Sequence, residues 1–135
     1  EIPAPEGPVE RRMFEKLAGN VSGATWKLLQ THWPGPVTFL IRVGDDTVGF
    51  RFPSHPVGRA FLEQCGVPVV ATSANASGAP SPTSVAGTMG VAESAVCVIN
   101  AGRTPLEGDS TIVDLTGDKP RCVRRGVAPW PADQA

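Results

Sequence analysis

The side chains in this sequence that could bind a ligand are hydroxyls, one amide and arginines, and several lie in one polar loop. The loop TSANASGAPSPTS spans residues 72–84 and directly follows the apolar run VPVVA. Connections between elements usually take about four to six residues, and longer ones tend to be functional. Ligands of α/β sheets bind outside the carboxyl ends of strands, and this loop would begin at such an end.

Within the loop, Ser73 and Asn75 alternate with Ala74, so an extended backbone would point both polar side chains to one side. The exposed amides of such a turn can hold an anion, and Thr83 could cap a following helix, whose amino terminus favours phosphate. On composition alone, however, the favoured interpretation is a solvated loop whose asparagine and serines satisfy their own turns.

A second set of polar residues lies in the strand-like segment TVGFRF. The two-residue period places Thr47, Gly49 and Arg51 on one face, opposite Phe50 and Phe52. Arginine can hold a carboxylate or phosphate through two hydrogen bonds, although an arginine at a strand end is usually just exposed to solvent.

Two more segments have the same character. Ser110 opens the strand-like DSTIVDL, and Arg124 lies in RCVRRG. By itself, DSTIVDL is better explained as an ordinary strand start with Asp109 as a turn residue, and the signal at Arg124, taken singly, is weak.

Other chemistries find no support in the sequence. His32 and His55 lie far apart, and neither belongs to a metal-ligand pattern such as HExxH, so no metal site is predicted. GxSxG, GxxxxGKS and GxGxxG are all missing, and no nucleophile or acid–base pair is evident. The inventory suits the binding and orientation of polyanions more than covalent catalysis.

The elements that must position these side chains alternate between helix and strand. Residues 1–9 carry three prolines and a glycine and should not begin as a helix. We expect helices over 10–18, 23–33 with Ser22 as N-cap, and 55–65 with Gly66 after the last turn, and a short one over 84–92. The β-rich runs 37–43 and 47–52 predict a hairpin, and 67–71, 95–100, 110–115 and 121–125 predict further strands. This interleaving predicts a single α/β domain with a mixed sheet.

Composition limits the class of protein. The chain has 135 residues, 41% hydrophobic and 19% charged, with a net charge of −1, so no overall basic field attracts nucleic acid. No apolar run approaches the roughly 20 residues that span a bilayer, and no signal-peptide pattern is present. Cys65, Cys97 and Cys122 are odd in number, far apart and in apolar contexts. We expect them to be buried free thiols of a cytoplasmic protein without membrane contact.

Read in order, five stretches resemble the threonylcarbamoyl-AMP synthase family, which has the YrdC-like fold. They are HWPGPVTFLI, VGFRFPSHPV, GVPVVATSANASGAPSPTS, DSTIVDLTGD and PRCVRRGVAP. A WPGP turn, an SAN-x-SG-x-PSPT loop and an ST-(I/V)-VDL strand in that order form a specific combination. The resemblance implies an α/β fold in which a twisted mixed β-sheet with flanking helices surrounds a central cavity.

The resemblance also implies an activity. Enzymes of this family are nucleotidyltransferases that join L-threonine, bicarbonate and ATP into threonylcarbamoyl-adenylate, which serves the threonylcarbamoyladenosine modification of tRNA. Magnesium is the expected counter-ion of ATP, and tRNA or tRNA-modification proteins are possible partners. The implied threonine ligands are Arg51, Ser73 and Ser110, and the implied ATP ligands are Thr47, Asn75, Thr83 and Arg124. No catalytic side chain is implied, because orientation and charge stabilisation suffice for this chemistry.

The sequence departs from the family at its start. The family's amino-terminal segment carries a threonine-tyrosine-glycine-leucine stretch and a Lys-x-Arg phosphate motif, and neither is present. Arg11, Arg12 and Lys16 are not assigned to that motif. We therefore expect residues 1–135 to form a partial domain, roughly the latter two thirds, with no second domain and little activity alone. Arg125 also stands where the family often has proline.

Two alternatives stay open. One is the YrdC-like domain of a carbamoyltransferase of the hydrogenase-maturation type, which uses carbamoyl phosphate and ATP in longer chains with zinc-finger-like cysteines. The other is a non-catalytic RNA-binding module, which the net charge of −1 disfavours because Lys and Arg contacts to phosphate dominate such binding.

Overall fold

The computed structural model describes residues 8–88 and 90–131, and the side chains from residue 11 onward. The chain divides into two compact units. The first comprises Glu1–Val70 together with Ser110–Ala135, and the second is Ala71–Asp109.

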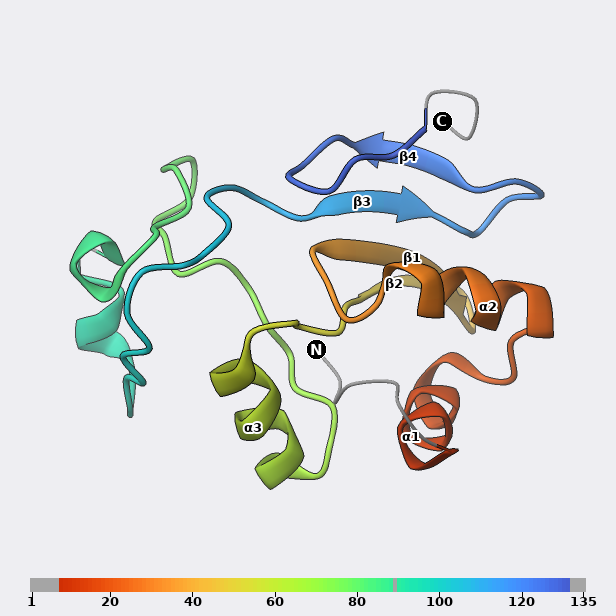
Figure 1. Ribbon diagram of the computed structural model, residues 1–135, viewed down its shortest axis with the longest axis horizontal. Coiled ribbons are helices and arrows are strands. Elements are labelled where there is room, and N and C mark those ends of the chain that lie inside the picture. Colours follow the sequence, from red (N-terminus) through yellow and green to blue (C-terminus); the bar gives the residue numbers. More distant parts are fainter. Residues whose placement is uncertain (1–7, 89, 132–135) are drawn as a thin grey trace. The chain divides into compact units, whose positions relative to one another are not determined.

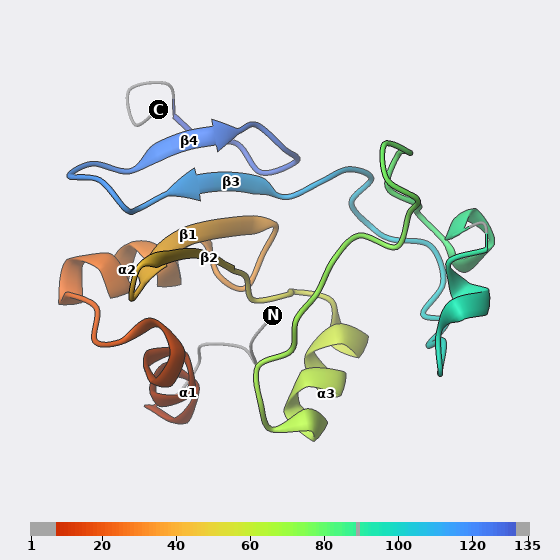
Figure 2. The ribbon, with the colours of Figure 1, turned by 180° about the vertical axis from the view of Figure 1, so that it is seen from behind.

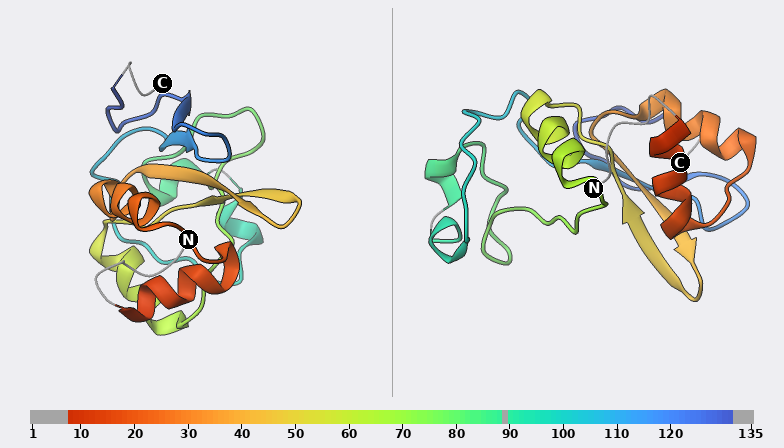
Figure 3. Two further views of the ribbon diagram at one scale, coloured as in Figure 1. Left: turned by 90° about the vertical axis from the view of Figure 1, so that its right-hand side faces the viewer. Right: turned by 90° about the horizontal axis from the view of Figure 1, so that it is seen from below.

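The described residues of the first unit form a mixed sheet, as predicted, and it has four strands. Its strands are β1 (Val37–Val43), β2 (Asp46–Phe50), β3 (Thr111–Asp114) and β4 (Arg121–Arg124), in the order β2-β1-β3-β4 (Figure 1). β1 runs antiparallel to β2 and parallel to β3, and β4 runs antiparallel to β3. Figure 3 shows β1 and β2 as a hairpin. The hairpin turns at Gly44, whose φ of 62° suits a two-residue connection.

The described part of the same unit also contains the helices α1 (Pro8–Ala18), α2 (Gly23–His32) and α3 (Pro56–Cys65). The Ser22 hydroxyl accepts a hydrogen bond from the Thr25 amide and caps α2, as expected. α3 ends at Gly66 in the left-handed region, which also confirms the prediction. Helix α1 begins at Pro8 rather than residue 10, because a proline is tolerated in the first turn, where its missing N–H has no helical partner.

Figure 2 shows helices α1 and α2 on one side of the sheet. Aromatic side chains of these helices and of the strands form the core. Along β1, Val37, Phe39 and Ile41 are buried, whereas the residues between them face the other side of the sheet. Phe14 of α1 packs edge-on against Phe50, with 5.1 Å between ring centroids. One face of the sheet is thus buried in the core.

The chain after β4 returns across this buried face. Thr111 is fully buried, and its hydroxyl donates to the Ala128 carbonyl while accepting from the Gly126 amide. Arg125, at the position where the family often has proline, donates to the Trp130 carbonyl at 3.2 Å. These bonds hold Trp130 in the core.

Two predicted strands do not form. Residues 67–71 and 95–100 have no strand neighbour among the described residues, and Val70 and Val96 are fully exposed. β-rich composition indicates that a segment fits a pleated, half-buried surface, but a strand also needs a partner for its backbone groups. The predicted helix over 84–92 is two 3₁₀ turns instead, Val85–Thr88 and Ala92–Ser94.

None of the described residues of the second unit is buried. The unit is held by bonds such as those from the Thr104 amide to the Thr83 carbonyl and from the Ser81 hydroxyl to Asp109. The three cysteines are free, as predicted. The expectation of burial is wrong for Cys97, which is exposed because its segment is not a packed strand, and Cys65 and Cys122 are half-buried.

Candidate binding face of the sheet

The sheet face opposite the aromatic core carries the polar residues of the first unit. Thr38 on β1 and Ser110 just before β3 meet on this face, with 2.8 Å between their hydroxyl oxygens. Arg124, at the end of β4, donates two hydrogen bonds to the Ser110 carbonyl, from Nε at 3.1 Å and from Nη2 at 2.8 Å. Nη2 also lies 3.3 Å from the Ser110 hydroxyl. Two of the predicted site residues, Ser110 and Arg124, are therefore in direct contact.

Arg51 lies at the same end of the sheet. Phe50 pairs with Phe39, and Arg51 follows one residue later, at the level of Thr38. It is half-buried between Phe50 and Phe52, both of which face the core, so alternation places Arg51 on the polar face. The prediction that Arg51 lies opposite these phenylalanines is confirmed.

The WPGP turn explains why these strand ends lie together. The Gly35 amide donates to the Phe52 carbonyl, and the Pro36 carbonyl accepts from the Thr111 amide, each at 2.9 Å. The turn thus ties the chain after β2 to the start of β3. Only glycine fits at position 35, because a Cβ there would come within 2.7 Å of the His32 carbonyl oxygen.

Thr47 lies on the same polar face of the sheet as Arg51 but at the opposite end of the strand. It pairs with Arg42 near the hairpin turn, four residues before Arg51 and thus about 13 Å away along the strand. Asp114 lies at the carboxyl end of β3, where its carboxylate accepts from the Thr116 hydroxyl at 2.6 Å and from the Thr116 amide at 2.8 Å. These bonds, chiefly that of the Thr116 hydroxyl, hold the pKa of Asp114 below its usual range, with Arg121 contributing less. The carboxylate and the Ser110–Arg124 pair therefore occupy opposite ends of β3.

The predicted residues of the second unit make local contacts. Asn75 Nδ2 donates to the carbonyls of Ala76 and Ala79, each at 2.9 Å, so the side chain closes its own turn. Its Oδ1 is buried without a hydrogen-bond partner. Ser73 is exposed, and Thr83 is half-buried.

Two positional predictions for this loop are wrong. Residues 67–71, which directly precede residues 72–75, form no strand, so residues 72–75 do not lie at the carboxyl end of one. Thr83 caps no α-helix, because the 3₁₀ turn Val85–Thr88 follows it and four residues cannot build a helix dipole. That Ser73 and Asn75 share a cavity with Arg51 and Ser110 remains a prediction.

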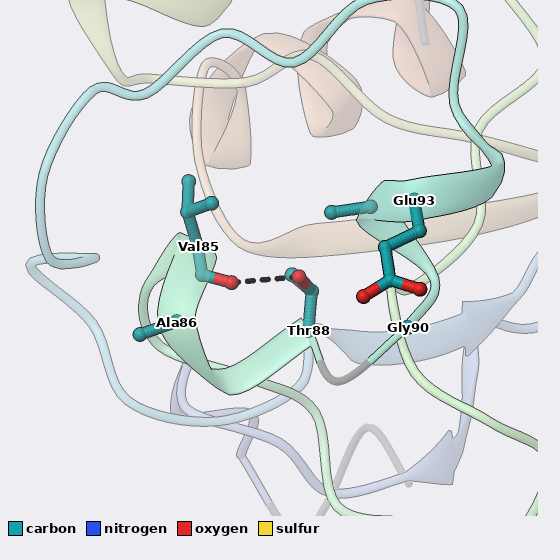
Figure 4. A pocket seen from close by; sticks show the side chains of 6 residues that line it. Val85, Ala86, Thr88, Gly90 and Glu93 are labelled. Atoms are coloured by element: carbon teal, nitrogen blue, oxygen red, sulfur yellow. Dashed lines mark hydrogen bonds between the residues drawn. The ribbon is translucent and has the colours of Figure 1, made fainter.

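An open hollow of about 420 Å³ lies at the two 3₁₀ turns, lined by Val85, Ala86, Thr88, Gly90, Ala92 and Glu93 (Figure 4). The Thr88 hydroxyl donates to the Val85 carbonyl at 2.6 Å. None of the predicted site residues is among those that line it.

Sequence reasoning missed Thr38. The alternation in VTFLIRV carried the signal, because it places Thr38 opposite the buried Val37 and Phe39. Within residues 8–88 and 90–131, no group of three His, Cys, Asp or Glu side chains could hold a metal ion, and no helix is long and apolar enough to cross a membrane.

A known protein family and several known proteins are similar to most of this chain. The sequence model of the Sua5/yciO/yrdC family, described as "Telomere recombination", matches residues 10–126. The threonylcarbamoyl-AMP synthase of Pyrococcus abyssi is 36% identical over 130 residues, which cover 86% of this chain and 37% of the relative. That of Bacillus subtilis is 29% identical over 125 residues, or 84% of this chain and 36% of the relative.

Solved structures give the same picture. The crystal structure of P. abyssi Sua5 complexed with L-threonine superposes with a TM-score of 0.76 and 33% identity, over 85% of this chain and 37% of that one. Escherichia coli YciO, at 23% identity, shares the fold with a TM-score of 0.71 over 88% of this chain and 63% of that one. The chain thus spans little more than a third of the length of the P. abyssi and B. subtilis relatives.

Proposed function

This chain belongs to the Sua5/yciO/yrdC family, and from that premise we propose that it takes part in the synthesis of threonylcarbamoyl-AMP from L-threonine, bicarbonate and ATP. The reaction is a nucleotidyl transfer that releases pyrophosphate, and its product serves the threonylcarbamoyladenosine modification of tRNA. The activity belongs to the whole protein that contains these residues.

The residues assigned from the resemblance keep their roles in this proposal. Those for threonine are Arg51, Ser73 and Ser110, and those for ATP are Thr47, Asn75, Thr83 and Arg124. Magnesium would accompany the triphosphate as its counter-ion. A guanidinium suits a carboxylate or a phosphate, and hydroxyls complete the hydrogen bonding without adding charge.

One observation carries the proposal. Ser110, Arg124 and Arg51 come from three different strand ends and lie at one end of one sheet face. The fold that brings them there is shared with a protein whose structure was determined with L-threonine. Asn75 adds support, since its buried and unpartnered Oδ1 is an acceptor that a ligand could satisfy.

The first experiment measures threonine binding and pyrophosphate release in the full gene product. We expect Arg51→Gln to weaken threonine binding about ten- to a hundredfold, since a charge-assisted hydrogen bond contributes about 1.5–3 kcal/mol. Arg42→Gln is the matched control, because Arg42 is exposed on the same strand pair but at the opposite end. Equal binding by wild type and Arg51→Gln would contradict the assignment.

The same assay separates the alternative activities. Pyrophosphate release that requires threonine and bicarbonate supports the proposal. Release that requires carbamoyl phosphate instead would identify a carbamoyltransferase. A protein that retains tRNA in a salt-dependent manner and releases no pyrophosphate would be an RNA-binding module.

A further inference from the structure

Thr38 is fixed between two neighbouring strands by the two branches of its side chain. Its hydroxyl lies 2.8 Å from the Ser110 hydroxyl, on the β3 side. Its methyl group lies toward β2, where a Cβ on Gly49 would come within 3.2 Å of it. Because β1 stands between β2 and β3, the two branches point in opposite directions and set one rotamer.

The Ser110 hydroxyl has a limited capacity for hydrogen bonds: one proton to donate and two lone pairs. Arg124 Nη2, at 3.3 Å, can only donate, and it therefore occupies one lone pair. If Ser110 gave its proton to Thr38, a ligand would meet only the remaining lone pair. If Thr38 donates instead, the Ser110 proton is left for a ligand acceptor.

Two features favour the second arrangement. Ser110 Oγ is the only hydrogen-bond partner that the described part of the chain gives to the half-buried Thr38 hydroxyl, so its proton is satisfied only by donation to Ser110. The Arg124 guanidinium also lies beside Ser110, which disfavours a cationic ligand group there and favours an oxygen that accepts.

We propose that Thr38 is a positioning residue for threonine: it donates to Ser110 and thereby directs the Ser110 proton to an acceptor oxygen of the bound amino acid, not to its ammonium group. This inference rests on the proposed function. It makes the threonine of the WPGP-V-T segment part of substrate recognition without contact to the substrate.

The test compares threonine affinity and steady-state kinetics for the full gene product and its Thr38→Val, Thr38→Ser, Ser110→Ala and Thr38→Val/Ser110→Ala variants. Valine keeps the shape of threonine and removes the hydroxyl. We expect Thr38→Val to raise the Kd and KM for threonine about three- to tenfold, the loss of one hydrogen bond. The kcat, the KM for ATP and the melting temperature should stay near wild type. Serine should restore the affinity, and the double variant should bind no more weakly than Ser110→Ala.

A second variant tests the rotamer without removing the hydroxyl. We expect Gly49→Ala to weaken threonine binding because its new methyl group displaces the Thr38 methyl. Thr38→Ser removes that methyl, so Gly49→Ala should have little effect in the Thr38→Ser background.

The inference is overturned if Thr38→Val binds threonine as well as wild type while Ser110→Ala does not. It is also overturned if serine fails to rescue, or if the losses in the double variant add. A wild-type protein that binds no threonine overturns the proposed function, and the inference falls with it.

Discussion

Two similar β-rich segments, one in each unit of this chain, adopt different structures. VTFLIRV, residues 37–43, forms the central strand β1, with Phe39 fully buried. AVCVIN, residues 95–100, forms no strand in the second unit, where Val96 is fully exposed. The difference lies in what surrounds each segment. β1 has backbone partners on both sides and helices over one face, and residues 95–100 have neither within the described part of their unit. A segment with high β-propensity therefore forms a strand only where neighbouring strands and a packed face are present.

The candidate site residues differ in the same way. Ser110 is held by Thr38, 72 residues earlier in the chain, and by Arg124, 14 residues later. Asn75 instead bonds to carbonyls no more than four residues away. The geometry at Ser110 is therefore fixed by the fold, whereas that at Asn75 is fixed by its own turn.

The largest effect we expect comes from removing an aromatic side chain of the first unit. Phe14 is fully buried, and its ring lies 5.1 Å from Phe50, 5.7 Å from Trp26 and 6.0 Å from Trp33. Phe14→Ala should lower the free energy of unfolding by about 3–5 kcal/mol in urea titrations, because it removes contacts and leaves a cavity. Val96→Ala, in the second unit, should change it by less than about 0.5 kcal/mol. Equal losses in the two variants would show that the second unit has a core of its own.

A smaller effect is expected at the buried hydroxyl of Thr111. Thr111→Val keeps the volume but leaves the Gly126 amide and the Ala128 carbonyl without their partner. We expect a loss of about 1–3 kcal/mol in the free energy of unfolding. Thr31→Val is the control, because the exposed Thr31 hydroxyl bonds only to the Lys27 carbonyl of its own helix. An unchanged stability of Thr111→Val would mean that water satisfies both backbone groups.

Thiol labelling compares the units directly. Cys97 is exposed in the second unit, and Cys65 and Cys122 are half-buried in the first. We expect a thiol reagent to modify Cys97 about tenfold faster than the other two under native conditions, and all three at similar rates in denaturant. The variants Cys65→Ser and Cys122→Ser assign the phases. Simultaneous labelling of all three in the native protein would contradict the contrast between the units.

Local signals in the sequence predicted the local structure well. Ser22, Gly66 and the break at residues 44–46 each act through their nearest neighbours, and the helix cap, helix end and hairpin turn follow. The mixed sheet was also predicted. The pairing of β1 with β2 was predicted as a hairpin, but the pairing of β1 with β3 was not, because the parallel pairing of Val37 with Thr111 joins residues far apart in the chain. Such pairings depend on tertiary packing, which a single sequence does not display.

The candidate site shows the same division. The period of two placed Arg51 on the correct face, since Phe50 and Phe52 are both buried. Nothing in the sequence indicated that Arg124 would grip the Ser110 carbonyl, or that Thr38 would meet its hydroxyl, because both contacts arise from strand order. The prediction of strands at residues 67–71 and 95–100 was wrong. Their composition suits a strand, but no neighbouring strand pairs with them among the described residues.

The smallest expected effect concerns His32, at the end of α2 beside the core of the first unit. Its ring lies 4.8 Å from that of Trp130 and 5.9 Å from that of Phe39, and partial burial lowers its pKa. The unfolded chain, with a histidine pKa of about 6.5, then takes up this proton at a higher pH than the folded chain. The contribution of His32 to stability is therefore complete above about pH 6.5 and is lost as the pH falls through the unfolded value toward the folded one. His32→Phe keeps a ring beside Trp130 and cannot be protonated, so its stability should fall less than that of wild type between pH 7.5 and 5.5. Urea titrations at the two pH values measure this difference. An identical fall in both proteins would place the pH dependence in groups other than His32.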